Sequence, residues 1–176
     1  RDPAVAAGIN GARNNSRYLP GLALPARFDA SADLAGLVRR ADVLVMAVPA
    51  QGFRAVLRLA RPHLRAWVPV ISLSKGLEQR SNLRMTEIVR EELPDHPAGV
   101  LSGPNLAQEI LAGQAAASVL AMDDPAIMAQ LQPLFSSGLF RVYTNDDVIG
   151  CDLGGVLKHV IAIAVGMGDG QGAGDN

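Results

Sequence analysis

The sequence predicts an α/β fold built on a doubly wound, mainly parallel sheet, and three observations indicate it. Short apolar runs of strand length alternate along the chain with amphipathic segments of helical length, an order that joins parallel strands through right-handed crossovers. Several of these runs are apolar throughout and end at proline or glycine, which is typical of strands buried on both faces. Apolar residues make up 49% of the 176 residues but aromatic residues only 4%, so we expect a core of aliphatic side chains.

The first forty residues predict two helices with a strand between them. Asp2-Pro3 combines a capping side chain with a proline at the first helical position, and the helix that starts there should end in the polar stretch 13–21. Residues 26–31 have the pattern of a short strand. Ser31 or Asp33 can then cap a second helix, which precedes the first long apolar run.

From residue 41 onward the strand and helix signals alternate without a long gap. Each expected strand is a short apolar run closed by a turn residue, and each expected helix has apolar residues spaced three or four apart. The expected strands are 41–50, 68–76, 98–103, 115–122 and 140–145, and the expected helices are 51–64, 82–93, 106–113 and one beginning at Asp124.

The pattern changes near Asp147, where "VIGCDLGGVLKHVIAIAVGMG" (148–168) lacks turn signals. Its apolar residues can line several faces of one long helix, which is typical of a buried helix. We therefore expect one domain over 1–145 and the start of a second, helical domain over 146–176. The chain opens without a methionine and both ends look cut, so we expect a piece of a longer protein.

Charge and cysteine content argue against several classes of protein. The formal net charge of −1 provides no broad basic surface for nucleic acid or for an anionic membrane. Cys151 is the single cysteine, which excludes an internal disulfide and is compatible with a reducing cytoplasm. No unbroken apolar run reaches the roughly 18 residues of a membrane span, and no secretory signal pattern opens the chain.

Three strand ends carry polar residues suited to a binding site. Ligands of open parallel sheets bind in the crevice at the carboxyl ends of the strands. Pro49 follows the first long strand, Lys75 lies at the tip of the next, and Gly103 and Asn105 precede a helix whose first N–H groups favour an anion. Each could also be an ordinary turn between strand and helix, but three in succession favour a site.

Only two of the 16 basic residues are lysines, Lys75 and Lys158. A desolvated lysine can give up its proton, whereas arginine cannot readily do so. Lys158 lies in an apolar helix, where a charge is costly without a partner or a role. It either reaches solvent from the helix surface or protonates a carbonyl oxygen in a cleft.

The glycine cluster "GDGQGA" (168–173) has the spacing of a dinucleotide-binding turn. Such a turn follows a strand and opens a helix, whereas this one follows a helical segment. We therefore interpret the match as coincidental.

Six stretches have sequences that occur together in one family: "NNSRYLPG" (14–21), "VPAQ" (48–51), "SLSKGLE" (72–78), "VLSGPNLAQEI" (100–110), "FRVYTNDDVIG" (140–150) and "LGGVLKHVIAIAVGMGDG" (153–170). Together they resemble the bacterial NAD(P)-dependent sn-glycerol-3-phosphate dehydrogenases, over the whole chain. The resemblance implies a truncated Rossmann-like dinucleotide-binding domain over 1–145 and the truncated start of an all-α substrate domain over 146–176.

The resemblance also implies an activity. The full-length enzyme would interconvert sn-glycerol 3-phosphate and dihydroxyacetone phosphate by hydride transfer with NAD or NADP, in the cytoplasm, for glycerophospholipid precursor synthesis. Its expected partner is this small substrate, with no metal, no nucleic acid and no membrane span, and it would be a homodimer. The fragment alone is expected to be inactive.

Residue roles carried over from the family are expectations of the same kind. Lys158 would be the general acid at the C2 oxygen and would also contact the substrate. The remaining substrate contacts would be Lys75, Gly103 and Asn105, and the cofactor contacts Arg1, Tyr18, Pro49, Lys75 and Ala107.

Two positions depart from the family's pattern. His159 stands where the family usually has asparagine, and Asn105 stands where threonine is frequent. An imidazole can donate one hydrogen bond as an amide does, but with different geometry and charge. The alternatives are a related reductase acting on ketopantoate or a 3-hydroxyacid, and a truncated, inactive domain.

Overall fold

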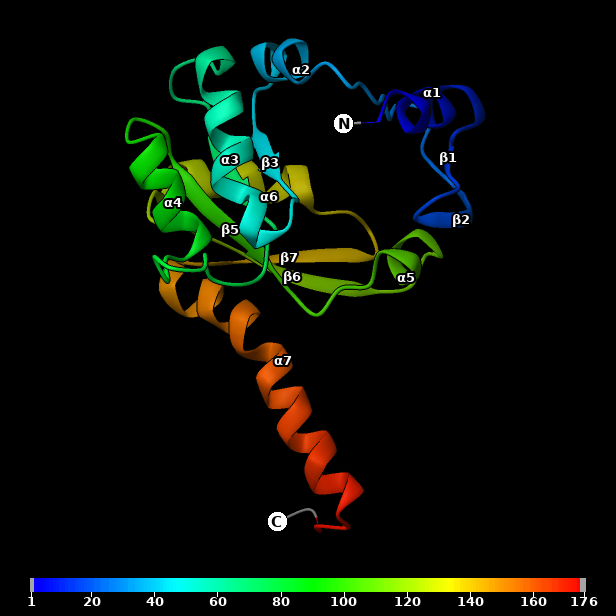
Figure 1. Cartoon of the computed structure of the whole chain (residues 1–176), viewed down its shortest axis with the longest axis vertical. Helices are drawn as coiled ribbons and strands as arrows, with labels where there is room; N and C mark the ends of the chain where they lie inside the picture. Colours follow the sequence, from blue (N-terminus) through cyan, green and yellow to red (C-terminus); the bar gives the residue numbers. More distant parts are fainter. Residues whose placement is uncertain (1, 175–176) are drawn as a thin grey trace.

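The computed structural model describes residues 2–174, and its centre is a five-stranded sheet in the order β3-β4-β5-β6-β7. Figure 1 shows this sheet between layers of helices, with the last helix extending away from it. The strands are β3 (Leu44–Met46), β4 (Val70–Ser72), β5 (Ala98–Ser102), β6 (Ala116–Met122) and β7 (Phe140–Asn145). The predicted α/β, Rossmann-like class is confirmed.

The sheet is mainly parallel, with one exception. β3, β4 and β5 run parallel, as do β6 and β7, but β5 and β6 are antiparallel. The segment between β5 and β6 contains only the short helix α5 (Ala107–Leu111), which contacts β2 (Leu19–Ala23) instead of crossing the sheet. Because a parallel return needs a crossover along the sheet, the chain comes back antiparallel.

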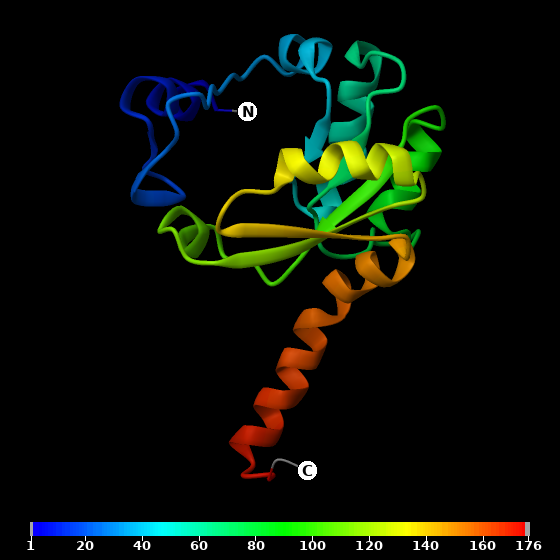
Figure 2. The same cartoon turned by 180° about the vertical axis from the view of Figure 1, so that it is seen from behind.

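Helices cover both faces of the sheet, so the core has two main parts. On one face α3 (Ala50–Ala60) and α4 (Met85–Glu92) enclose Phe53, Leu57 and Ile88 with β4. On the other face, seen from the front in Figure 2, α6 (Pro125–Phe135) packs Leu131 against Leu120 of the sheet. The aliphatic core expected from the composition is therefore present.

Capping residues set the starts of the helices as the sequence predicts. Asp2 caps α1 (Pro3–Ala12), Asp33 caps α2 (Leu34–Arg40), and Asp124 caps α6, each through hydrogen bonds from backbone N–H groups. α3 ends earlier than expected because Pro62 falls in the following turn, the 3-10 helix η1 (Arg61–His63).

The strand expected over 26–31 is absent, because those residues form a turn and irregular structure. The extended pair lies earlier, where β1 (Asn14–Asn15) and β2 form a small antiparallel hairpin. Arg13 adopts a left-handed conformation with φ of 51°, and Leu24 N donates to its carbonyl oxygen at 2.7 Å. The hydrogen bond between Leu24 and Arg13 closes the polar stretch into a hairpin. The local sequence does not reveal this contact.

The long helix α7 (Val148–Gly170) begins close to the expected residue but is not buried along its length. Val148, Asp152 and Gly155 are buried, whereas Val160, Ile161, Ile163, Val165 and Met167 are each more than half exposed. The expectation of a buried helix is therefore wrong in the described residues. By length and composition α7 could also cross a membrane, although charged residues interrupt its apolar run.

The glycine cluster is not a dinucleotide-binding turn. Gly168 and Gly170 are the last turn of α7, so no strand precedes the motif.

Candidate functional site

A cleft of about 300 Å³ lies where the ends of β4 and β5 meet the first turns of α7. Lys75, Gly103 and Lys158 all line it, together with Ser102 and Cys151. Three residues that the sequence analysis placed on different elements are therefore in one place. The carboxyl ends of parallel strands are also where sheets of this kind bind their ligands.

The side chain of Lys75 reaches the residue that follows the end of β5. Its Nζ donates a hydrogen bond to the carbonyl oxygen of Gly103 at 2.9 Å. Burial lowers the pKa of the Lys75 ammonium below its ordinary value, and the positive charge of Lys158 lowers it further. The two ammonium groups therefore form a cationic site that a negatively charged ligand would stabilise.

Two glycines let the backbone approach this cleft closely. A Cβ on Gly155 would lie 3.1 Å from Ser102 Oγ and 3.6 Å from Lys75 Cγ. A Cβ on Gly103 would lie 2.6 Å from the carbonyl oxygen of Ala117. Glycine at both positions allows α7 and the end of β5 to pack around Lys75.

α7 is anchored by a buried carboxylate, six residues before Lys158. Asp152 is 2% exposed, and its Oδ2 accepts a hydrogen bond from Thr86 Oγ1 at 2.8 Å. The backbone N–H of Thr86 donates to the same oxygen at 3.4 Å, and Arg84 Nη1 lies 3.9 Å from it. Burial raises the pKa of Asp152 above its ordinary value, against the opposing effect of the hydrogen bonds from Thr86.

Comparison with known proteins identifies the family. The family model described as NAD-dependent glycerol-3-phosphate dehydrogenase N-terminus matches residues 1–128, and the corresponding C-terminus model matches residues 147–176. The chain belongs to the NAD-dependent glycerol-3-phosphate dehydrogenase family.

Relatives within this dehydrogenase family are similar along the whole chain. Glycerol-3-phosphate dehydrogenase [NAD(P)+] 2 of Sphingopyxis alaskensis is 64% identical over 176 residues, which are 100% of this chain and 53% of that protein. Glycerol-3-phosphate dehydrogenase [NAD(P)+] of Mycobacterium avium is 51% identical over 177 residues, 52% of its length. The chain thus spans about half the length of the curated relatives it matches.

Solved dehydrogenase structures have the same fold. A crystal structure of glycerol-3-phosphate dehydrogenase from Coxiella burnetii superposes with a TM-score of 0.88 at 32% identity, covering 99% of this chain and 54% of that one. A ketopantoate reductase from Ralstonia eutropha reaches a TM-score of 0.59 at 19% identity. That second likeness is one of fold alone.

Of the expected cofactor contacts in the described residues, only Lys75 lines the cleft. Pro49 precedes α3 and lines a separate, largely apolar pocket of about 540 Å³. Tyr18 is 64% exposed on the β1–β2 hairpin, with the guanidinium of Arg17 5.3 Å from its ring centre. Ala107 is exposed at the start of α5, and Arg1 lies outside the described residues. Among the described residues, Tyr18, Pro49 and Ala107 therefore do not line the cleft that contains Lys75.

Asn105 lies beside Gly103 but does not line the cleft. Its Nδ2 donates a short hydrogen bond to Ser118 Oγ, while its Oδ1 is buried and accepts no hydrogen bond from any residue in 2–174. A buried acceptor without a donor is costly. Because this oxygen is buried and Asn105 does not line the cleft, a ligand in the cleft does not reach it in this arrangement.

The sequence analysis missed three features of the site. Cys151 lines the cleft, and burial raises the pKa of its thiol, with Asp147 and Asp152 adding to the effect. Gly155 and the anchor at Asp152 were also missed. Positions 151, 155 and 158 are spaced four and three apart, so helical periodicity traced back from Lys158 would have found the first two. His159, by contrast, is exposed.

Proposed function

We propose that the full-length protein interconverts sn-glycerol 3-phosphate and dihydroxyacetone phosphate with NAD or NADP. The observation that carries the proposal is the meeting of Lys75 and Lys158 in one cleft of a chain from this family. Two ammonium groups suit a phosphorylated substrate, because they attract its negative charge. The relatives' names give the same activity to those proteins.

In the proposed mechanism, Lys158 acts as the general acid. The reduced nicotinamide, when bound, supplies the hydride that adds to C2 of the ketone. As the C2 carbonyl becomes an alkoxide, Lys158 gives its Nζ proton to that oxygen and is left as a neutral amine, which solvent reprotonates. In the reverse direction the neutral amine accepts the proton of the C2 hydroxyl.

Lys75 is proposed to lie between the substrate and the nicotinamide. Its hydrogen bond to Gly103 fixes the ammonium at the cleft, where its charge stabilises negative charge on the substrate. Gly103, which lines the cleft, would contact the substrate, and the same role is proposed for Asn105 from the family resemblance. For the cofactor we propose Tyr18, Pro49 and Ala107, together with Arg1, which lies outside the described residues.

The remaining properties of the protein are proposed by the same inference. The dinucleotide-binding domain would extend over 1–145, and residues 146–176 would begin an all-α substrate domain. α7 would belong to that fold and not to a membrane, because its first turns are packed against the sheet. A homodimer in the cytoplasm that supplies phospholipid precursors is the corresponding proposal for the whole protein.

A substrate comparison tests the activity. The full-length gene product is assayed for oxidation of NADH and of NADPH with dihydroxyacetone phosphate, and with ketopantoate as the alternative substrate. We expect turnover of the phosphorylated ketone, and the ratio of the two rates gives the cofactor preference. Turnover of ketopantoate alone would leave the fold intact but remove the phosphosubstrate role from Lys75, Gly103 and Asn105.

A further inference from the structure

The segment that carries Lys75 has no regular secondary structure of its own. Residues 73–84 connect β4 to α4 without a helix or strand. Gly76, immediately after the lysine, has φ of 124°, a conformation that side-chain-bearing residues rarely adopt. An irregular segment of this kind needs contacts from neighbouring elements if its lysine is to keep one position.

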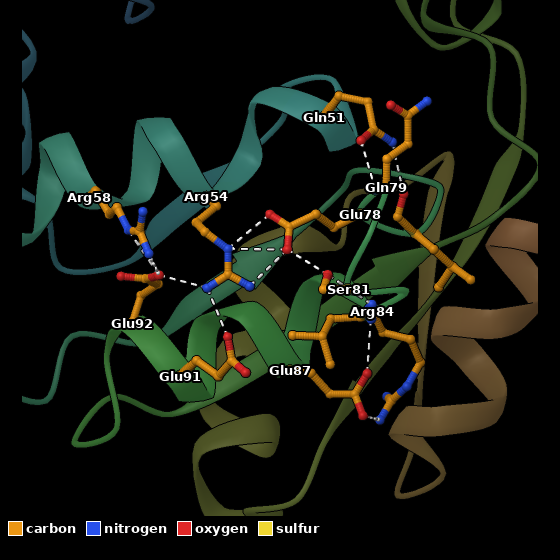
Figure 3. Close-up of polar contacts among 12 residues, drawn as sticks. Gln51, Arg54, Arg58, Glu78, Gln79, Ser81, Arg84, Glu87, Glu91 and Glu92 are labelled. Atoms are coloured by element: carbon orange, nitrogen blue, oxygen red, sulfur yellow. Dashed lines mark hydrogen bonds and ion pairs between the residues drawn. The ribbon is translucent and has the colours of Figure 1, made fainter.

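Gln51, in the first turn of α3, holds this segment with both ends of its carboxamide. Its Nε2 donates to the carbonyl oxygen of Leu77 at 2.8 Å, and its Oε1 accepts from the N–H of Gln79 at 2.9 Å. Figure 3 shows the side chain reaching from the helix to the loop. Gln51 therefore fixes the backbone on both sides of Glu78.

Arg54, one turn further along α3, holds the residue between those two bonds. Its Nε and Nη2 donate to the two carboxylate oxygens of Glu78, each at 2.8 Å, in a forked arrangement (Figure 3). Ser81 Oγ donates to the same carboxylate at 2.6 Å. The third guanidinium nitrogen, Nη1, donates to Glu91 and Glu92 on α4. Arg54 thus ties the segment to two helices.

Contacts on the other side of Lys75 come from the same stretch of chain. Ser74 Oγ donates to the carbonyl oxygen of Val48 at 2.5 Å. A Cβ on Gly76 would lie 3.3 Å from Ala50 Cβ, so the loop passes close to the start of α3. Residues 48–54 therefore hold the chain both before and after Lys75.

We propose that Gln51 and Arg54 are positioning residues for Lys75, acting through the backbone of residues 77–79 to fix its ammonium at the cleft. The proposal rests on the proposed function for its effect on turnover. A loop free to move would let the ammonium leave Gly103 and lose its alignment with the substrate. A misplacement of about 1 Å in such a site can cost on the order of a hundredfold in rate.

The cluster of charged residues formed by Arg54, Arg58, Glu78, Glu91 and Glu92 could instead serve only to hold α3 against α4. Arg58 distinguishes this structural role from the positioning role. Arg58 donates to Glu92 on α4, with Nε at 3.0 Å, but within the described chain no hydrogen bond or ion pair joins it to residues 73–84. If the cluster only holds α3 to α4, replacing Arg58 should resemble replacing Arg54. If the cluster positions Lys75, only replacement of residues that contact the segment 73–84 should lower the activity.

The test compares Gln51→Met, Arg54→Met and Arg58→Met in the full-length gene product. Gln51 is exposed, so the first variant removes both hydrogen bonds from a position that tolerates change. We expect Gln51→Met and Arg54→Met to lower kcat/KM for dihydroxyacetone phosphate by about tenfold or more, with KM for the cofactor changed less than about twofold. Arg58→Met should leave both values at those of the unmodified enzyme.

A second readout does not depend on turnover. The pH dependence of Lys75 modification by an amine-reactive reagent, followed by peptide mass spectrometry, reports how the lysine is held. Lys158 is the charged group that shares its cleft, and Cys151 is the other titratable group there. In Gln51→Met the midpoint should move to higher pH, because Lys75 leaves its desolvated place beside Lys158. Arg58→Met should not move it.

The outcomes are distinguishable. If Gln51→Met has the kinetic constants of the parent enzyme and the same midpoint pH for Lys75 labelling, the positioning role is overturned. Equal losses of kcat/KM in Arg58→Met and Gln51→Met would also overturn it. Absence of dihydroxyacetone phosphate turnover in the unmodified enzyme would overturn the proposed function instead. In that case the midpoint shift in Gln51→Met alone decides whether Lys75 is positioned from α3.

Discussion

At the scale of single residues, the two lysines of the cleft are held in different ways. Lys75 is on an irregular segment and is fixed by a hydrogen bond to Gly103, whereas Lys158 is partly buried on a regular helix. A lysine on a helix changes position only if the helix does. This suits Lys158 to the proton transfer, in which the distance to the C2 oxygen must be kept within hydrogen-bonding reach.

Replacing Lys158 with alanine should therefore lower the rate of the chemical step and leave cofactor binding nearly unchanged. We expect kcat of the full-length gene product to fall by about 10²–10⁴-fold, which is the contribution of a general acid, while the Kd for NADH or NADPH stays within about threefold. Steady-state kinetics and a fluorescence titration of the cofactor measure the two quantities. Equal losses in both would mean that the lysine is structural.

A methyl group at Gly155 should displace the side chains that line the cleft. The added Cβ would lie 3.1 Å from Ser102 Oγ and close to Lys75, so we expect Gly155→Ala to lower kcat/KM. Gly166→Ala is the matched control in the same helix, because a Cβ there meets no atom of the described residues within 4 Å apart from the adjacent helix backbone. Alanine at that position should raise stability by up to about 1 kcal/mol through helix propensity. A Gly155→Ala enzyme as active as Gly166→Ala would contradict the close-approach argument.

At the scale of elements, a buried carboxylate on α7 bonds to the first turn of α4. Asp152 accepts hydrogen bonds from the side chain and backbone of Thr86. Asp152→Ala leaves both donors unpaired, which should cost about 1–3 kcal/mol in the free energy of unfolding. Asp152→Asn keeps an acceptor and removes the buried charge, so its cost should be smaller. Denaturant unfolding of both variants checks the order, and a larger loss for asparagine would refute it.

The Arg54–Glu78 ion pair should make the attachment of residues 73–84 to α3 sensitive to acid. Hydrogen bonds from Arg54, then from Ser81, lower the pKa of Glu78 to about 2. A carboxylate with a depressed pKa contributes stability above its unfolded-state value, near 4.3, and this contribution is lost as the pH falls toward 2. We expect the denaturant midpoint to fall over that window, and to fall less in Arg54→Met. A parallel pH dependence in the two proteins would contradict this assignment.

The helices and strands also indicate which parts of the structure can be predicted from the sequence alone. β7 and the capped starts of α1 and α6 were predicted closely because capping and apolar period are local signals. The false strand over 26–31 and the antiparallel return into β6 depend on contacts between distant residues. In the site, Lys75 and Lys158 were found because lysine is rare in this chain. The Thr86–Asp152 contact joins residues 66 positions apart and left no local pattern.

At the scale of the whole molecule, α7 extends away from the sheet (Figure 1). Its apolar side chains Val160, Ile161, Ile163, Val165 and Met167 are each more than half exposed. Contiguous exposed apolar surface of this kind promotes association. We expect the 176-residue chain expressed alone to be inactive and to self-associate as its concentration rises. Ile163→Glu, at a position 64% exposed, should reduce that association. Sedimentation velocity measures it, and a monodisperse monomer at all concentrations, or turnover by the isolated chain, would refute the expectation.

The place of Lys158 along α7 has a mechanical consequence. The helix is 23 residues long and is held at Asp152 and Gly155. With a rise of 1.5 Å per residue, Lys158 lies about 5–9 Å from these anchoring residues and the last residue, Gly170, about 22–27 Å from them. A sideways displacement of the far end therefore reaches the lysine reduced about threefold to fivefold. Lys158 therefore stays near the C2 oxygen, while the far end of α7 can move with whatever packs against it.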